Sequence, residues 1–327
     1  MYVQTQNLFE ESNVEKEYTS VIPDAMIGIR FDLALAQLFP DYSRSRIQAW
    51  IRNGKLTVDG KCIRPRDPTR GGEWVQLVIE SQQETTWEPE ALSVSVIHRD
   101  EHIMVIDKPA GLVVHPGIGN SRGTLVNALL HREPRLAAIP RAGIVHRLDK
   151  DTSGLLVVAC TLRAHKRLVE LLKFHEIQRE YDAVVVGDML AGGHIDAPIG
   201  RHRTQRTKMA ITDQGKAAIT HYRIRHRFSG HTHIGLRLQT GRTHQIRVHM
   251  AHIDHPLVGD PVYGGRLLLP RKASEALIDV LREFKRQALH ASRLSFPHPI
   301  SEQPCAFDSP LPRDFSGLLD ALSRHAR

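Results

Sequence analysis

The hydrophobic positions of residues 21–80 predict two short helices followed by two strands. Apolar side chains crowd residues 31–39, and Pro40 ends this helix because proline cannot continue the hydrogen-bond ladder. Ser43 is the expected N-cap of a second helix, whose apolar positions recur every three or four residues. The predicted elements are helices at 31–39 and 44–52 and strands at 56–60 and 74–79.

A longer region, residues 93–315, has more short strands than helices. Short runs rich in β-branched residues predict buried strands, and alternation of apolar and polar positions predicts a half-buried one. The predicted strands are 102–106, 144–145, 155–160, 182–186 and 234–238, and the predicted helices cover 168–172, 243–252 and 277–284. This mixture indicates the α+β fold class.

Three further segments border and divide these regions. Residues 1–20 are polar and rich in glutamate, which predicts a flexible acidic leader without the basic start and apolar centre of a secretion signal. Residues 81–92 predict a linker, and residues 316–327 predict a C-terminal tail. The expected order is therefore leader, small domain, linker, large domain and tail.

Composition and charge narrow the class of protein. With 41% hydrophobic and 24% charged residues, the 327-residue chain is typical of a globular protein, and its apolar runs are far below the roughly 18 residues of a membrane span. Three widely spaced cysteines argue against a disulfide framework or a zinc site and fit a reducing cytoplasm. The net charge of +8 favours a nucleic-acid partner, and residues 28–72 hold nine Lys or Arg against four Asp.

The segment His146–Gly154 is the densest in chemically active side chains, and it lies between two predicted strands. It contains a histidine, an arginine, two aspartates, two hydroxyl side chains and a glycine. Loops held by a rigid sheet are a common place for catalytic groups. The alternative is a hydrogen-bonded turn whose aspartates cap backbone N–H groups, which is the role we expect for Asp151.

This loop and four other segments resemble the RluA-type pseudouridine synthases. The five segments, in chain order, are Asp107–Leu112, Arg141–Gly154, Arg179–Ala183, Thr240–Met250 and His255–Gly264. The amino-terminal module resembles the S-four RNA-binding domain, named after a ribosomal protein. Taken together, the chain is most similar to the branch of the family that acts on large-subunit (23S) ribosomal RNA.

The resemblance implies a catalytic domain on a long, mostly antiparallel sheet, preceded by the S-four-like domain. It also implies an isomerisation, in which the bond from ribose carbon 1′ to the uracil nitrogen breaks and carbon 5 bonds to the same ribose carbon. Such a reaction has no redox or phosphoryl-transfer step, so we expect no cofactor and no metal. Asp149 matches the family's catalytic aspartate. The sequence leaves three roles open for Asp149: attack on carbon 1′, attack on the base, or removal of the ribose 2′ proton.

Three other residues match positions of the family's active site. Arg247 matches the arginine that pairs with the aspartate, and a carboxylate in a closed pocket needs such a counter-charge to stay ionised. Tyr181 matches a tyrosine that stacks on the displaced uracil, and Leu289 corresponds to an apolar wall of the pocket. The local sequence pattern alone also allows two structural interpretations: Arg247 as a surface arginine and Tyr181 as an ordinary core residue.

RNA binding is expected at the small domain, at a basic run between two strands and at the pocket. A paired uridine must be flipped out of its stack, and the resemblance supports Arg147 in filling the vacated space, with a structural salt bridge as the alternative. For the other basic segments, a solvated surface is the alternative. The expected RNA-binding residues are Arg44, Arg46, Arg52, Arg147, Arg201, Arg203, Arg206, Lys208 and Arg242.

Two functions of other classes stay open. One is a non-catalytic RNA-binding or ribosome-assembly factor on an inherited synthase fold. The other is a metal-dependent RNA hydrolase that uses the histidines at 244, 249, 252 and 255, although their spacing lacks the i, i+4 pair of a zincin helix. The expected partner is large-subunit ribosomal RNA, free or in an assembling subunit, and we expect a cytoplasmic monomer that binds no membrane.

Overall fold

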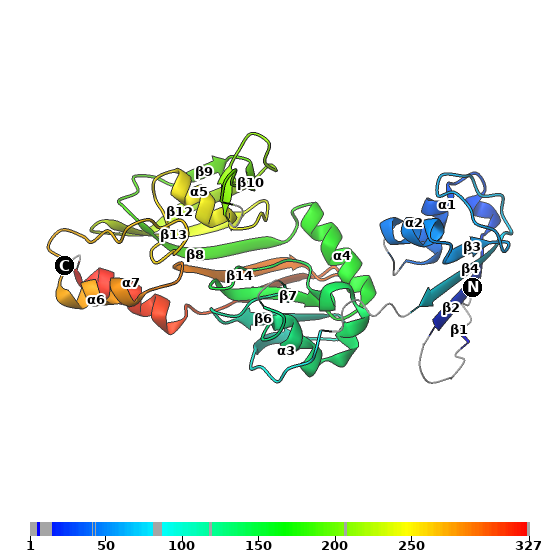
Figure 1. Cartoon of the computed structure of the whole chain (residues 1–327), viewed down its shortest axis with the longest axis horizontal. Helices are drawn as coiled ribbons and strands as arrows, with labels where there is room; N and C mark the ends of the chain where they lie inside the picture. Colours follow the sequence, from blue (N-terminus) through cyan, green and yellow to red (C-terminus); the bar gives the residue numbers. More distant parts are fainter. Residues whose placement is uncertain are drawn as a thin grey trace. The chain divides into compact units, whose positions relative to one another are not determined.

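The computed structural model describes residues 5–6, 15–40, 42, 44–80, 87–117, 120–205 and 208–325. The chain divides into two compact units, Met1–Thr86 and Trp87–Arg327 (Figure 1). None of the helices in the described ranges has the length and apolar character needed to cross a membrane.

The first unit joins two helices and a small antiparallel sheet around one hydrophobic core. Its strands have the order β1-β2-β4-β3. The elements are β1 (Thr5–Gln6), β2 (Glu15–Val21), η1 (Asp24–Met26), α1 (Phe31–Leu38), α2 (Arg44–Arg52), β3 (Leu56–Val58) and β4 (Trp74–Glu80). The apolar faces of both helices and alternate positions of β3 and β4 enter the core, as the hydrophobic pattern predicted.

Strand β2 differs from the sequence analysis, which assigned residues 15–20 to a leader. This strand pairs with β4 along its whole length, and Tyr18 packs against the core. The strand is held by backbone hydrogen bonds to β4, which do not depend on the polarity of its side chains. Its polar sequence therefore has no hydrophobic pattern that would predict a strand. The rest of the predicted leader apart from Thr5–Gln6, and the predicted N-cap Ser43, lie outside the described residues.

The second unit is built on one long sheet with the order β5-β6-β7-β14-β8-β13-β12-β9, and β15 pairs with β14. Within the described sheet, β7 and β14 run parallel and the other pairs are antiparallel. This confirms the predicted α+β class and the mostly antiparallel sheet.

The bounds of the second unit's elements are as follows. The sheet strands are β5 (Ser95–Arg99), β6 (Ile103–Lys108), β7 (Ser153–Ala159), β8 (Gln178–Val186), β9 (Gly193–Asp196), β12 (Ile219–Phe228), β13 (His231–Leu238), β14 (Leu289–Pro297) and β15 (Pro304–Asp308). A separate hairpin consists of β10 (Ile199–Arg201) and β11 (Met209–Ile211). The helices are α3 (Leu125–Arg132), η2 (Pro134–Ala138), η3 (Pro140–Gly143), α4 (Leu162–Lys173), α5 (Gln245–His252), α6 (Glu275–Glu283) and α7 (Arg313–His325).

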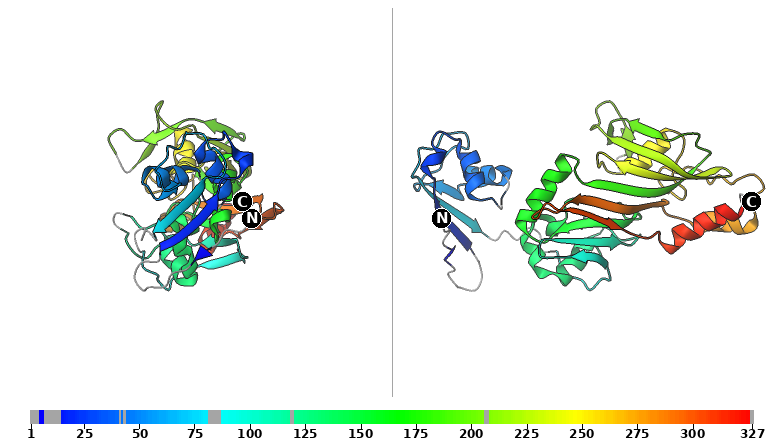
Figure 2. Two further views of the ribbon diagram at one scale, coloured as in Figure 1. Left: turned by 90° about the vertical axis from the view of Figure 1, so that its right-hand side faces the viewer. Right: turned by 180° about the vertical axis from the view of Figure 1, so that it is seen from behind.

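The long sheet carries a hydrophobic core on each face, and β7 contributes to both. Leu156 and Val158 face a core that includes α3 and α5, whereas Leu155 and Val157 face a core shared with α4. A further cluster joins α6 and α7, which lie at the other end of the sheet from α4 (Figure 2). Burial on both faces explains why β7 is a continuous apolar run in the sequence.

The predicted strand at Ile144 and Val145 is wrong. The chain instead leaves the turn η3, and Ile144 makes a single bridge to Val158. Two residues beside a tight turn cannot build a ladder, so the apolar pair was an insufficient signal. The predicted strand at 155–160 is present as β7.

The boundaries of the large domain also differ from those predicted. Residues 313–325 form α7, whose buried apolar residues recur at helical spacing, so most of the predicted tail at 316–327 belongs to the core. Trp87, from the predicted linker, packs against the core of the second unit. Residues 81–86 of that linker lie outside the described ranges.

Lys108 ties the end of β6 to the polar loop that precedes β7. Its side chain is fully buried, and Nζ donates hydrogen bonds of 2.8–2.9 Å to the carbonyl oxygens of Pro109, Leu112 and Lys150. Burial lowers the pKa of Lys108 to about 7, and nearby carboxylates act against this shift. Three acceptors around one nitrogen need three N–H donors, so the ammonium form fits the site.

Replacing Lys108 by methionine should lower the free energy of unfolding by at least about 2 kcal/mol, because three buried carbonyl oxygens lose their donor. Urea unfolding of Lys108→Met measures this change. The exposed Lys285→Met is the matched control and should stay within about 0.5 kcal/mol of the wild type. Equal stability of the two variants would contradict the structural role of Lys108.

Candidate active site

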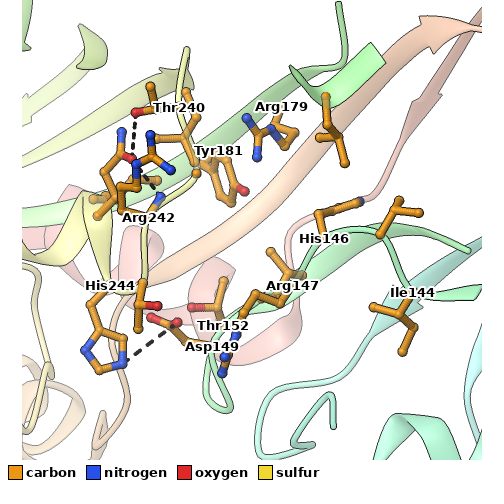
Figure 3. A pocket seen from close by; sticks show the side chains of 18 of the residues that line it. Ile144, His146, Arg147, Asp149, Thr152, Arg179, Tyr181, Thr240, Arg242 and His244 are labelled. Carbon is orange, nitrogen blue, oxygen red and sulfur yellow. Dashed lines mark hydrogen bonds and ion pairs between the residues drawn. The ribbon is translucent and has the colours of Figure 1, made fainter. Parts of the chain in front are cut away.

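A cavity of about 600 Å³ lies beside β8 in the second unit. Its walls come from residues 141–152, the end of α4, β8, and residues 238–247, which lead from β13 into α5. Figure 3 shows side chains from these segments around the cavity. Segments that are distant in the sequence therefore share one site.

Two glycines hold the loop of residues 144–153 against the sheet at its two ends. Gly143 has a φ of 79°, and a Cβ there would lie 2.0 Å from the carbonyl oxygen of Ala159. Gly154 has a φ of 113°, and a Cβ there would lie 2.3 Å from the carbonyl oxygen of Ala291. At these two positions only glycine fits both the backbone conformation and the available space. The two ends of the loop can therefore lie in close contact with β7 and β14.

Asp149 and Arg247 meet in this cavity. Arg247 Nη1 donates a hydrogen bond of 3.1 Å to Asp149 Oδ2, and Nε and Nη2 donate bonds of 2.7 and 2.9 Å to the two oxygens of Asp260. The side chains of Arg247, Asp149 and Asp260 are 5%, 16% and 0% exposed. The guanidinium thus lies between two carboxylates, with a bidentate contact to the deeper one, and we call this arrangement the acid–arginine triad.

The charges of the acid–arginine triad stabilise one another. Burial disfavours the charged form of Arg247, but the hydrogen bonds and charges of Asp260 and Asp149 outweigh it and raise the pKa of Arg247. Burial likewise raises the pKa of Asp260, but the hydrogen bonds from Arg247 and from backbone N–H groups outweigh it and lower that pKa. A full positive charge therefore stands beside Asp149 at neutral pH.

His244 and Tyr263 complete the surroundings of Asp149. His244 Nε2 lies 3.9 Å from Asp149 Oδ1, and His244 Nδ1 lies 2.9 Å from the hydroxyl of Tyr263. Burial lowers the pKa of His244 although Asp149 acts in the opposite direction, so the ring is neutral. The ring of Tyr263 also contacts the guanidinium of Arg247, with 5.0 Å from Cζ to the ring centroid. Both residues restrict the positions that Asp149 and Arg247 can take.

One oxygen of Asp149 is free for chemistry. Oδ2 accepts the hydrogen bond from Arg247, whereas Oδ1 has no hydrogen-bond donor among the described residues. The dashed line in Figure 3 marks the approach of His244 Nε2 to this oxygen, at 3.9 Å, which is too long for a hydrogen bond. A carboxylate that is oriented through one oxygen and open at the other can act as a nucleophile or as a base.

Tyr181 and Leu289 form part of the cavity wall on the neighbouring strands β8 and β14. They are 5% and 4% exposed, and both belong to the main core as well as to the lining of the cavity. Burial raises the pKa of Tyr181, so its hydroxyl keeps its proton. A planar ring held against this wall would be shielded from water.

Two arginines predicted to contact RNA lie at the cavity. Arg147 is exposed and makes no hydrogen bond or ion pair with a described residue, so the alternative of a structural salt bridge has no support. Arg242 donates from Nε to the carbonyl oxygen of Ala217 at 3.1 Å. Both line the cavity, and their contact with RNA stays a prediction.

A second predicted RNA-binding surface lies on the hairpin of β10 and β11. Arg201 and Arg203 are exposed there, and Lys208 is partly exposed just before β11. Arg206 lies outside the described residues. The segment connects two strands, as predicted, and its contact with RNA stays a prediction.

The predicted RNA-binding arginines of the first unit have different surroundings. Arg44 Nη2 lies 2.8 Å from the fully buried carboxylate of Asp32, which is a structural role that the sequence analysis did not foresee. Arg46 lies over the ring of Trp50, with Cζ 5.4 Å from the ring centroid. Arg52 is exposed at the end of α2. Of the three, Arg44 is the one whose partner is a fully buried carboxylate.

The histidines at 244–255 have separate partners rather than a common one. His249 is buried and contacts the carbonyl oxygen of Ala197, and His255 contacts that of Val186. In the described ranges, no three His, Cys, Asp or Glu side chains are grouped as metal ligands.

Of Asp260, His244 and Tyr263, only His244 stands out in the sequence, and there only as one of the four histidines that a metal-dependent hydrolase would use. The segment His255–Gly264 contains two of them and was noted for its resemblance, but nothing in its spacing shows that Asp260 meets Arg247, 13 positions away. The available signal was an aspartate that follows a glycine and precedes a proline, which predicts only a turn.

Comparisons with known proteins agree with both units. A family model described as RNA pseudouridylate synthase matches residues 102–252, and a model of the S4 domain matches residues 29–75. The ribosomal large subunit pseudouridine synthase D of Xanthomonas campestris pv. campestris is 56% identical over 93% of this chain and 92% of its own length. The proteins of the same name from Pseudomonas aeruginosa and Escherichia coli K12 are 55% and 54% identical, over 92% and 94% of this chain and 94% of their own lengths.

Solved structures of lower identity have the fold of the second unit. Human RNA pseudouridylate synthase domain containing 4 has a TM-score of 0.55 and 27% identity, over 70% of this chain and 93% of that protein. Human RNA pseudouridylate synthase domain containing 1 has a TM-score of 0.52 and 26% identity, over 68% and 85%. With the identity to full-length relatives, these matches show that the chain belongs to the RNA pseudouridine synthase family, in the group of ribosomal large subunit pseudouridine synthase D, and carries an S4 domain ahead of its synthase domain.

Replacing Asp260 by asparagine should lower kcat by about tenfold to a hundredfold with little change in KM, because Asp260 orients Arg247 and does not face the cavity. The free energy of unfolding should fall by about 3 kcal/mol, since a buried ion pair is broken. Steady-state kinetics and urea unfolding measure the two effects. The exposed Asp279→Asn is the matched control, and a wild-type kcat in Asp260→Asn would refute the positioning role.

The stability that Asp260 contributes should depend on pH. Its pKa in the folded protein is lower than the value of about 3.9 in an unfolded chain, so its contribution is present above that value and is lost as pH falls through the folded pKa. The difference in unfolding free energy between wild type and Asp260→Asn should therefore shrink between about pH 5 and pH 2. A difference that stays constant over this range would count against the ion pair.

Proposed function

We propose that this chain is an RNA pseudouridine synthase that isomerises uridines in large-subunit (23S) ribosomal RNA. The observation that carries the proposal is the pairing of Asp149 with a buried Arg247 in a cavity of about 600 Å³, a size suited to a nucleotide. Belonging to the synthase family supports the reaction, and the names of the relatives support the RNA class.

In this proposal the uridine is displaced from its stack and its uracil enters the cavity against Tyr181 and Leu289. Arg147, exposed at the entrance, fills the space left in the RNA. The free oxygen of Asp149 attacks carbon 1′, attacks the base or removes the 2′ proton, and Arg247 balances its charge throughout. After the base has turned, carbon 5 bonds to carbon 1′ and loses its hydrogen, and Tyr181, which lines the cavity, is the side chain that would donate a hydrogen bond or transfer a proton.

The proposed partner is large-subunit ribosomal RNA, free or within an assembling subunit. The S4 domain supports RNA binding, and Arg46 and Arg52 of α2 would contact phosphates together with the exposed arginines of the β10–β11 hairpin. A ribosomal RNA substrate implies the compartment of ribosome assembly, the cytoplasm. We expect a monomer, which can approach a large RNA from one side, and we expect the reaction to need no cofactor or metal.

Wild-type protein should release tritium from large-subunit ribosomal RNA labelled at uracil carbon 5, in the presence of EDTA and without additives. That hydrogen leaves when carbon 5 forms the new bond. Asp149→Asn, which keeps the shape but loses the charge, should reduce the rate by at least about a thousandfold. Asp151→Asn is the matched control, because this neighbouring carboxylate takes no part in the acid–arginine triad.

Two results of this experiment would favour the other functions. Tight binding of RNA without tritium release, on free RNA and on immature subunits, would indicate an assembly factor on a synthase fold. Strand cleavage that EDTA abolishes would indicate a metal-dependent hydrolase. Release that is independent of Asp149 would place the chemistry on another residue.

The double variant Arg46→Gln and Arg52→Gln should weaken RNA binding and reduce the slope of log affinity against log salt by about 1 to 2, as expected for the loss of one or two phosphate contacts. Tritium release at saturating RNA should be unchanged. Arg282→Gln, an exposed arginine of α6, is the control and should leave the slope as it is. An unchanged slope in the double variant would remove these residues from the RNA interface.

A further inference from the structure

Unpaired polar atoms gather around the catalytic cavity. Among the described residues, four buried side-chain nitrogen atoms have no hydrogen-bond partner. Three of them, in His115, His146 and Arg179, belong to residues that line this cavity. A buried donor without an acceptor costs free energy, so such a cluster indicates a place where a ligand supplies the acceptor.

Arg179 is the strongest member of this cluster. The residue is only 8% exposed, its Nε is buried without a partner, and its side chain makes no hydrogen bond or ion pair with a described residue. Arg247 in the same cavity is also buried, but two carboxylates surround it. A buried N–H without an acceptor is costly, and no carboxylate among the described residues forms an ion pair with Arg179.

The fold makes room for this guanidinium. Arg179 stands two residues before Tyr181 on β8, so both side chains point to the cavity face of the strand, roughly 7 Å apart along it. A Cβ on Gly241 would lie 2.5 Å from Arg179 Nη1, so glycine is needed for the guanidinium to lie there. In Figure 3, Arg179 lies on the far side of Tyr181 from Asp149.

His146 adds a second donor to this side of the cavity. Its Nε2 accepts a hydrogen bond of 3.1 Å from the backbone N–H of Val157, and burial lowers its pKa to about 3, so the neutral ring carries its proton on Nδ1. That Nδ1 is the buried atom without a partner. Asp149 is the single carboxylate among the described residues that line the cavity, and Arg247 holds it. The side with Arg179 and His146 therefore offers donors and positive charge without an acidic group.

We propose that Arg179, together with His146, forms an anion subsite that binds the RNA backbone phosphate next to the nucleotide in the pocket. The subsite rests on the proposed function, because it assigns a place to the backbone of the same RNA. A phosphate matches the planar fork of an arginine with two parallel hydrogen bonds and supplies the missing negative charge. A base carbonyl would satisfy one donor and leave the charge of Arg179 uncompensated. Arg179 lines the same cavity on the far side of Tyr181 from Asp149, so a base bound at Tyr181 and Asp149 would leave Arg179 for the adjoining phosphate.

The test combines variants of the protein with RNA that lacks one charge. The RNAs are hairpins of large-subunit ribosomal RNA, each with one phosphate beside the modified uridine replaced by an uncharged methylphosphonate. The dissociation constant and the rate of tritium release are measured for wild type, Arg179→Gln, Gly241→Ala and the control Arg282→Gln. Gly241→Ala keeps the charge of Arg179 but displaces its guanidinium, and it needs only the end of a flexible side chain to move.

One methylphosphonate position should raise the dissociation constant of wild type and of Arg282→Gln by about tenfold or more, the effect of losing a charge-assisted hydrogen bond. The same position should change binding by Arg179→Gln and Gly241→Ala less than about twofold, because the contact is already absent. Both variants should bind unmodified RNA about tenfold more weakly, with kcat at saturation within a few-fold of wild type.

Two kinds of failure can be told apart. If every methylphosphonate weakens Arg179→Gln and Gly241→Ala as much as wild type, the anion subsite is wrong while the proposed function stands. A loss of kcat with unchanged binding in these variants would also overturn the subsite, since it would place Arg179 in the chemistry. If wild type releases no tritium from any of these RNAs, the proposed function fails, and the inference that rests on it fails as well.

Discussion

Arg247, held between Asp149 and Asp260, is the constraint on which the rest of the site depends. Removing three charged groups from water costs several kcal/mol for each, and only good geometry with every charge paired can offset it. The bidentate contact to Asp260 supplies this geometry and leaves one N–H of Arg247 for Asp149. The protein therefore holds the Asp149 carboxylate in a fixed orientation before any substrate binds, so the site needs less reorganisation during the reaction.

The sheet brings the parts of this arrangement together. Asp149 is on the loop before β7, Arg247 on α5 after β13, and Asp260 in the turn that follows α5. Glycines at the ends of the Asp149 loop allow the backbone to approach β7 and β14 closely. Lys108 joins the same loop to β6 through backbone carbonyl oxygens. The site is thus rigid because each part is bonded to a strand and not only to its neighbours along the chain.

The two sides of the cavity differ in charge, and this difference matches the two parts of a nucleotide. At one side the negative charge of Asp149 is balanced by Arg247, beside the apolar wall of Tyr181 and Leu289. On the other side Arg179 and His146 present donors without a carboxylate. A uridine has a neutral planar base and an anionic backbone, so its two parts match the two sides.

The sequence by itself determined the fold class, the main strands and helices, and the pairing of Asp149 with Arg247, which came from resemblance of motifs rather than from periodicity. The strands and helices depend on local spacing, as in the alternating strand β13 or the apolar faces of α1 and α2. The tertiary structure alone decided that β2 completes a sheet, that α7 belongs to the core, that Asp260 holds Arg247, and that Arg179 lacks a counter-ion. These depend on contacts between segments far apart in the chain, and a local pattern carries no record of which distant group a side chain will meet.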